Sequence, residues 1–147
     1  MLMSGLVIDR EVLIEAPAEV VWRTITEPDQ ISQWFASRVE LVIEPGAHGY
    51  MEFGDQGGPV VVEAVDPPTR FSFRWNHPRG EEPVAGNSTL IEFMLSETGD
   101  GTHLRVVESG FSKLDTTPER QETLRQGNVE GWGVELGHLE EHARARV

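Results

Sequence analysis

The sequence predicts an α+β fold in which a curved antiparallel sheet of seven strands wraps around a long C-terminal helix, with two short helices after the first strand. Short segments with alternating apolar and polar residues follow one another with turn sequences between them, which is typical of an antiparallel meander. The C-terminal segment carries one apolar stripe at helical spacing. The length of 147 residues suits one domain, and we expect it to span 1–147.

The N-terminal part of the chain predicts one strand and two short helices. Apolar residues alternate with acidic ones over 6–15, the period of a half-buried strand. Pro17 is expected at the first position of a helix over 17–26, because proline is tolerated there. Pro28 repeats the signal and predicts a second helix over 28–35, after a bend.

Six further strands are expected between these helices and the C-terminal helix, each bounded by proline, glycine or acidic turn residues. They are expected at 37–43, 48–53, 60–65, 70–77, 88–97 and 102–111. The glycine-rich segment "GDQGGP" (54–59) is interpreted as a hairpin loop, and Thr98 to Gly101 as a second hairpin turn. Short connections between consecutive strands predict antiparallel pairing.

The last helix is expected to begin with Thr117 as N-cap and Pro118 at the first helical position, and to run to about Ala145. Its apolar stripe consists of Val129, Trp132, Leu136 and Leu139. Glycine costs about 1 kcal/mol against alanine inside a helix, so the glycines of this segment need a reason. We expect Gly133 to bring the helix backbone close to the strands while Trp132 reaches into the space beneath.

One face of the predicted sheet is apolar. Phe71, Phe73 and Trp75 alternate with polar residues and therefore share a face. The same parity places further large residues on that face: Met51, Phe53, Ile91, Phe93, Leu95, Leu104 and Val106. The C-terminal helix is the element long enough to cover it. For each aromatic residue taken alone, a place in a dry core remains the alternative to a place in a pocket.

Composition excludes several function classes. There are 12 Lys and Arg against 25 Asp and Glu, a formal charge of −13 that repels nucleic acids and anionic membrane surfaces. The cysteine count of 0 excludes disulfides, thiolate metal sites and a cysteine nucleophile. The sequence contains neither a signal-peptide pattern nor an apolar stretch long enough to span a bilayer, so we expect a cytoplasmic protein.

The histidines predict no metal site. His138 and His142 stand four apart, the spacing of two zinc ligands on one helical face. The glutamates between them are not where a zinc-protease motif has its glutamate, and both histidines point away from the apolar stripe. We therefore expect them on a solvated face. His48, His77 and His103 are expected on the surface, and no cofactor is predicted.

Glu108 is the one candidate acid or base. It continues the inward parity of its strand, and a carboxylate desolvated in an apolar pocket would have a raised pKa suited to proton transfer. Arg10 shares the inward parity of its own strand and could pair with Glu108 or with an anionic ligand. The favoured alternative places Glu108 at the rim of the sheet, solvated or capping the following turn.

Four segments of the chain look familiar in their order and spacing: "IEAPAEVVWRTITEPDQISQWF", "EAVDPPTRFSFRW", "STLIEFMLSETGDGTHLRVVESGF" and "GWGVELGHLEEH". They resemble the START-like superfamily known as SRPBCC, in the branch related to the C-terminal domain of activators of the Hsp-90 ATPase. The resemblance covers Val7 to His142. It implies the helix-grip fold, also described as birch-pollen-allergen-like.

The resemblance also implies a hydrophobic cavity between the curved sheet and the last helix, used in the superfamily for lipids, polyketides, hormones or aromatic metabolites. Its "GW" pair corresponds to Gly131 and Trp132. We expect a ligand-binding site lined by Trp34, Phe35, Met51, Phe53, Phe71, Phe73, Trp75, Ile91, Phe93, Val106, Glu108, Val129, Trp132 and Leu136.

The leading hypothesis is therefore a binding module for a small hydrophobic or aromatic ligand. One alternative is an enzyme resembling polyketide cyclases and aromatases, with Glu108 as acid or base. Another is an interaction protein resembling chaperone activators; those carry a separate N-terminal domain that these residues do not contain, so chaperone binding is the least favoured. Expected partners are thus a small hydrophobic ligand and, at most, a second copy, since monomer and homodimer stay open; nucleic acid and membrane insertion are not expected.

Overall fold

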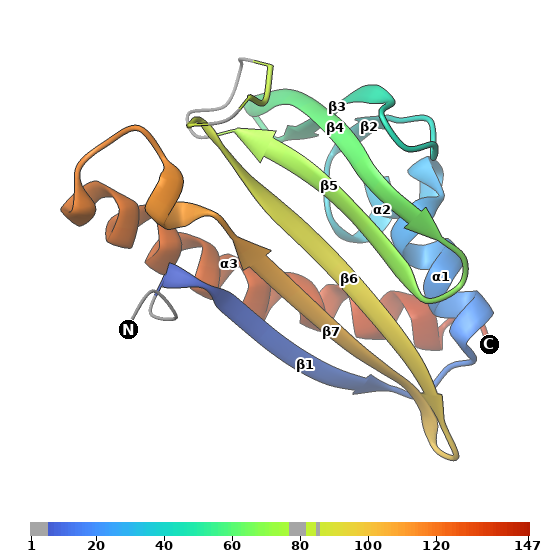
Figure 1. The fold of residues 1–147 in the computed structure, drawn as a ribbon. Helices are drawn as coiled ribbons and strands as arrows, with labels where there is room; N and C mark the ends of the chain where they lie inside the picture. The colour runs from blue at the N-terminus through green and yellow to red at the C-terminus, as the bar shows by residue number, and fades with distance from the viewer. Residues whose placement is uncertain (1–5, 77–81, 85) are drawn as a thin grey trace.

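A computed structural model describes residues 6–76, 82–84 and 86–147, and Figure 1 shows a curved sheet lying across one long helix. The strands are β1 (Ile8–Ile14), β2 (Arg38–Glu40), β3 (His48–Phe53), β4 (Gln56–Asp66), β5 (Arg70–Asn76), β6 (Ser88–Thr98) and β7 (Gly101–Ser109). The helices are α1 (Ala18–Thr26), α2 (Pro28–Trp34), the 3₁₀ turn η2 (Phe111–Lys113) and α3 (Pro118–Arg144). This architecture confirms the predicted fold class.

The sheet is antiparallel with the order β1-β7-β6-β5-β4-β3-β2. Strands β2 to β7 each pair with their neighbour along the chain, so the short turns between them determine the topology. Strand β1 pairs with β7 at the edge, where Ile8 lies opposite Glu108. The first and last strands therefore meet, and α1 and α2 occupy the connection between β1 and β2.

The two short helices begin almost where they were predicted. Pro28 is the first residue of α2, and the extended backbone of Glu27 separates α2 from α1, as expected. Pro17 is not helical, since its ψ of 154° makes it the N-cap of α1. The prediction for Pro17 was wrong by one residue, because proline restricts φ alone and suits both positions.

Two predictions in the β2–β4 region were wrong in extent. Strand β2 ends at Glu40, well short of the predicted strand over 37–43. The "GDQGGP" segment is mostly strand, since β4 begins at Gln56 and Gly54 takes the left-handed conformation in the turn, with a φ of +68°. Gly57 is needed for close approach, because a Cβ there would come within 2.9 Å of the Glu52 side chain. The presence of glycines in the sequence does not distinguish a glycine in a turn, such as Gly54, from a glycine in a strand that allows close approach, such as Gly57.

Helix α3 begins as predicted. The Thr117 hydroxyl accepts a hydrogen bond from the Arg120 amide at 3.2 Å, and Pro118 occupies the first helical position. The helix ends at Arg144, one residue before the expected end. Figure 1 shows its C-terminal part beside α1 and α2.

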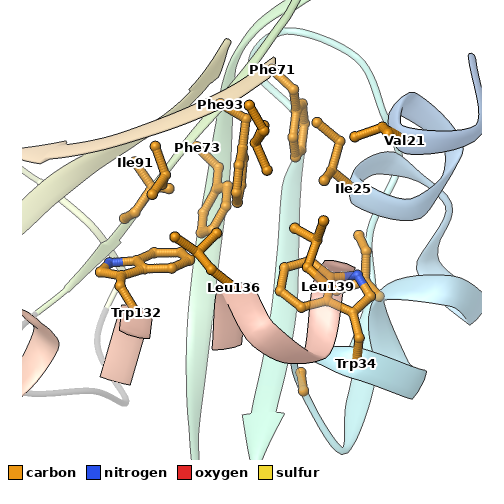
Figure 2. Close-up of a cluster of buried hydrophobic side chains, with 14 of the residues drawn as sticks. Val21, Ile25, Trp34, Phe71, Phe73, Ile91, Phe93, Trp132, Leu136 and Leu139 are labelled. Atoms are coloured by element: carbon orange, nitrogen blue, oxygen red, sulfur yellow. The ribbon is translucent and has the colours of Figure 1, made fainter. Parts of the chain in front are cut away.

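The apolar face of the sheet packs on α3, α1 and α2. Figure 2 shows Phe73 and Ile91 above Trp132 of α3, and Leu139 beside Trp34 and Ile25. These side chains belong to one buried cluster that also includes Phe71, Phe93, Leu104, Val106 and Leu136. The periodicity argument thus placed the large apolar residues on the correct face.

Gly133 has a different neighbour from the one predicted. A Cβ on Gly133 would lie 3.3 Å from Nη2 of Arg10, so the glycine makes room for a side chain of β1 and not for strand backbone. Arg10 is exposed, although Ile8 and Ile14, which share its side of the edge strand β1, are buried. The described hydrogen bonds of Glu108 come from other residues, so of the two partners suggested for Arg10 the structure does not show the first.

Within the described ranges, no helix is both long and apolar enough to cross a lipid bilayer.

Candidate functional site

Glu108 of β7 is completely buried, with an exposed fraction of 0%. The favoured prediction, a solvated carboxylate at the rim of the sheet, was therefore wrong. Sheet parity points Glu108 inward as expected, and α3 crosses this end of the sheet at Asn128 and Trp132. The place where α3 crosses the sheet depends on tertiary packing, which the alternation of residues along a strand does not predict.

Side chains from three elements donate hydrogen bonds to the Glu108 carboxylate. Trp75 Nε1 and Thr89 Oγ1 donate to Oε2 at 2.9 and 2.5 Å, and Trp132 Nε1 donates to Oε1 at 2.9 Å. Asn128 Nδ2 lies 3.0 and 3.1 Å from the two oxygens. A buried carboxylate is tolerated when donors satisfy its lone pairs, so this network ties β5, β6 and β7 to α3.

A cleft of about 210 Å³ lies next to this network. It is lined by Phe35, Phe53, Trp75, Asn128, Gly131, Trp132 and Glu135. The two tryptophans whose N–H groups bind Glu108 thus also contribute to the cleft wall. The carboxylate itself is not among the lining residues.

Phe35 contacts every other aromatic ring of the cleft. Its ring stacks on Trp132 and Trp75, with centroid distances of 5.4 and 5.8 Å and interplanar angles of 14° and 23°. It meets Phe53 edge-on at 5.1 Å. Phe35 is the C-cap of α2 and is half-buried, so the end of that helix forms one wall of the cleft.

Glu135 is the carboxylate of the cleft. Partial burial raises its pKa above the ordinary value, and the hydrogen bond with His138 opposes that shift. His138 Nδ1 and Glu135 Oε1 are 2.8 Å apart. The other oxygen, Oε2, has no hydrogen-bond partner among the described residues. The cleft therefore offers one carboxylate oxygen to a bound molecule.

The predicted ligand contacts divide into two groups. Phe35, Phe53, Trp75 and Trp132 line the cleft. The others are buried in the core, or half-buried against it in the case of Val129: Trp34, Met51, Phe71, Phe73, Ile91, Phe93, Val106, Glu108, Val129 and Leu136. A ligand-binding role for this second group stays a prediction.

Sequence reasoning missed Asn128 and Glu135. They lie four residues before and three residues after Trp132, so both share its side of α3. A search for polar residues at helical spacing around the "GW" pair would have found them. Gly131 was indicated by the resemblance alone.

A larger hollow of about 520 Å³ lies between the ends of β5, β6 and β7. Its lining residues are Arg74, Gly86, Ser88, Leu90, Ser109, Gly110, Ser112 and Lys113. Arg74 and Leu90 alternate with the inward residues of their strands, which places this hollow on the opposite face of the sheet. Its lining contains no aromatic ring, so it does not match the predicted site.

The described histidines have separate neighbours. His138 pairs with Glu135, whereas His142 is half-buried, with Nε2 3.4 Å from Gln30 Oε1. Burial lowers the pKa of His142, and Arg146 adds to that effect. The expected solvated face was therefore wrong for His142. His48 and His103 lie on or near the surface, and His77 lies outside the described residues.

Over the part of the chain that the structure describes, no group of three His, Cys, Asp or Glu side chains could hold a metal ion.

Comparison with known proteins agrees with this architecture. The family model described as Activator of Hsp90 ATPase homolog 1-like protein matches residues 15–144. Protein MLL2253 from Mesorhizobium loti is 26% identical, with a TM-score of 0.78 and coverage of 92% of this chain and 95% of that one. No curated protein matches the sequence.

Two further solved structures are relevant. DynU16, described as a protein in the dynemicin biosynthetic locus, is 25% identical with a TM-score of 0.76; the match covers 92% of this chain but 46% of DynU16. The Aha1 dimer from Colwellia psychrerythraea is 20% identical with a TM-score of 0.75, covering 94% of this chain and 96% of that one. At that identity, the second similarity is one of fold alone.

Proposed function

Because the chain belongs to the Activator of Hsp90 ATPase homolog 1-like family, we propose that it uses the family fold to bind a small aromatic ligand in the cleft between α3, the end of α2 and strands β3 and β5. The observation that carries this proposal is the wall of the cleft. Four aromatic rings, those of Phe35, Phe53, Trp75 and Trp132, meet at a hollow that the sequence had associated with ligand binding.

The size of the cleft limits the ligand to one ring with a short substituent. An apolar cavity of about 150 Å³ accommodates benzene, and this cleft measures about 210 Å³. A ligand burying about 200 Å² of apolar surface gains about 5 kcal/mol before the cost of association. Since association itself costs at least about 4 kcal/mol, we expect a neutral ring without polar contacts to bind with a dissociation constant of about 1 mM or weaker.

Glu108 supports the binding proposal over the enzyme alternative. An acid or base must reach the proton that it transfers, and this carboxylate is buried and held by donors from three elements. Its geometry suits the positioning of Trp75 and Trp132. The DynU16 similarity is compatible with either a carrier or an enzyme, so it does not favour catalysis.

The test is titration of the protein with toluene and benzyl alcohol, followed by saturation-transfer NMR and calorimetry. Gly131→Leu places a large side chain at the cleft, where a Cβ meets no atom within 4 Å, and should abolish binding. Gly137→Leu, on the same helix outside the cleft lining, is the matched control and should leave binding unchanged. Equal binding by both variants would contradict the proposal.

The remaining expectations stay predictions. A cytoplasmic location, one domain over 1–147 and the choice between monomer and homodimer belong to this group. Aha1 from Colwellia psychrerythraea forms a dimer, so sedimentation is the measurement for the last of them. Chaperone binding stays the least favoured, because the aromatic cleft accounts for the site without it.

A further inference from the structure

Most of the side-chain N–H groups around the cleft point toward the buried Glu108 carboxylate and not into the cleft. Trp75 Nε1, Trp132 Nε1 and Asn128 Nδ2 all donate to Glu108. An indole ring has this one donor and no acceptor. Both indole N–H groups of the cleft wall, and one of the two N–H bonds of Asn128, are therefore directed inward, away from a bound molecule.

Two oxygen atoms at the cleft are left as acceptors for a ligand. Asn128 turns its Nδ2 toward Glu108, which leaves Oδ1 without a hydrogen bond to any described residue. A reversed amide would place Oδ1 against the carboxylate, so the orientation follows from the network. Glu135 Oε2 is likewise without a partner in the described ranges. A ligand that satisfies both atoms must donate hydrogen bonds.

Charge and ring geometry favour the same kind of ligand. The lining residues include the Glu135 carboxylate and no lysine, arginine or histidine. The faces of Trp75, Trp132 and the phenylalanines attract cations, with tryptophan the strongest of the aromatic residues in this respect. An anionic ligand such as a fatty acid or a phosphate would meet the Glu135 carboxylate and no positively charged lining residue.

From these observations we infer that the cleft selects an aromatic ligand whose short side chain ends in a protonated amine, an arylalkylammonium ion. The inference rests on the proposed function and specifies the ligand class for the same cleft. The ring lies against Phe35 and the tryptophans, and the ammonium group donates to Glu135 Oε2 and Asn128 Oδ1. The net charge of −13 also attracts such a cation from a distance.

The test compares four probes that share one ring: benzylammonium, benzyl alcohol, toluene and benzoate. Calorimetric and NMR titrations at one ionic strength should show benzylammonium binding about tenfold more tightly than toluene, with benzoate the weakest. Glu135→Gln should reduce the benzylammonium affinity about fivefold to tenfold and leave the toluene affinity unchanged. Glu141→Gln, an exposed carboxylate on the same helix, should change neither.

The outcomes separate this inference from the proposed function. If toluene binds as tightly as benzylammonium, or benzoate binds more tightly, the ammonium class is wrong while an aromatic cleft stands. If Glu135→Gln leaves the benzylammonium affinity unchanged, the inference is wrong as well. If no probe shows saturable binding, both fail. Thermal unfolding of each variant, measured alongside, distinguishes a lost contact from a lost fold.

Discussion

Toward its C-terminus, α3 packs on α1, α2 and the sheet chiefly through apolar side chains, with His142 beside Gln30 of α2, whereas near its middle it covers a carboxylate. Leu139 and Ala143 are fully buried at the first region, and Leu139 lies beside Trp34 and Ile25 (Figure 2). At the second region, the described contacts of Glu108 are hydrogen bonds. Apolar packing is non-directional, but a buried carboxylate fixes the direction of each donor.

This difference explains where the cleft lies. At the apolar region, side chains adapt to one another and approach native density. At the polar region, the indole rings of Trp75 and Trp132 must keep their N–H groups on Glu108, so they are not free to turn into the adjacent space. The buried carboxylate therefore holds the aromatic wall in place.

The largest expected effect comes from the apolar region. Phe71→Ala removes a fully buried ring that packs against Trp22, Phe73 and Phe93, and should lower the free energy of unfolding by about 4 kcal/mol. Urea denaturation measures this change. Because Phe71 does not line the cleft, the folded variant should keep the ligand affinity of the parent protein, and a tenfold loss would show that the two regions are not independent.

Glu108→Gln should lower the free energy of unfolding nearly as much, although it replaces only one carboxylate oxygen by an NH2 group. A glutamine amide places an N–H group against donors, which leaves buried groups unsatisfied and lowers stability by about 3 kcal/mol. Unlike Phe71→Ala, it should also weaken toluene binding. The control is Glu92→Gln. The Glu92 carboxylate pairs with Arg70 at 2.8 Å on the outer face of the sheet, so its loss should change the free energy of unfolding by less than about 1 kcal/mol.

Gly131→Ala and Gly137→Ala separate stability from binding. Each glycine is exposed on α3 with open space where the Cβ would lie, so each substitution should stabilise the protein by up to about 1 kcal/mol through helix propensity. Gly131→Ala should weaken toluene binding, and Gly137→Ala should not. Identical affinities for the two variants would remove the reason offered for glycine at position 131.

The smallest effect is expected from Glu135→Gln. Burial raises the pKa of Glu135 in the folded protein, so its ionised form is disfavoured by folding. Below the pKa that Glu135 has in the unfolded protein, the group is protonated in both states and its full contribution to stability is present. As the pH rises through the higher pKa of the folded protein, that contribution is lost. Glu135→Gln should therefore be slightly more stable than the parent at pH 7, by less than about 1 kcal/mol, and equal to it below about pH 4. A less stable variant at pH 7 would contradict this.

The sequence predicted the elements well because their signals are local. Alternation predicted the inward face of the strands, and Thr117 with Pro118 predicted the start of α3. The site depends on tertiary contacts that carry no local signal. Parity directed Glu108 inward, but its burial depends on which turn of α3 crosses β7. Asn128 and Glu135 acquire a role only through their position beside Trp132.

The most direct test of the central claim is a titration with benzylammonium that follows the four tryptophan indole signals by two-dimensional NMR. Trp75 and Trp132 line the cleft, whereas Trp22 packs on Phe71 at the apolar region. We predict saturable shifts of the Trp75 and Trp132 signals with the Trp22 signal unmoved. Shifts of Trp22 without those of Trp132, or no saturable shift at all, would contradict ligand binding at the aromatic cleft.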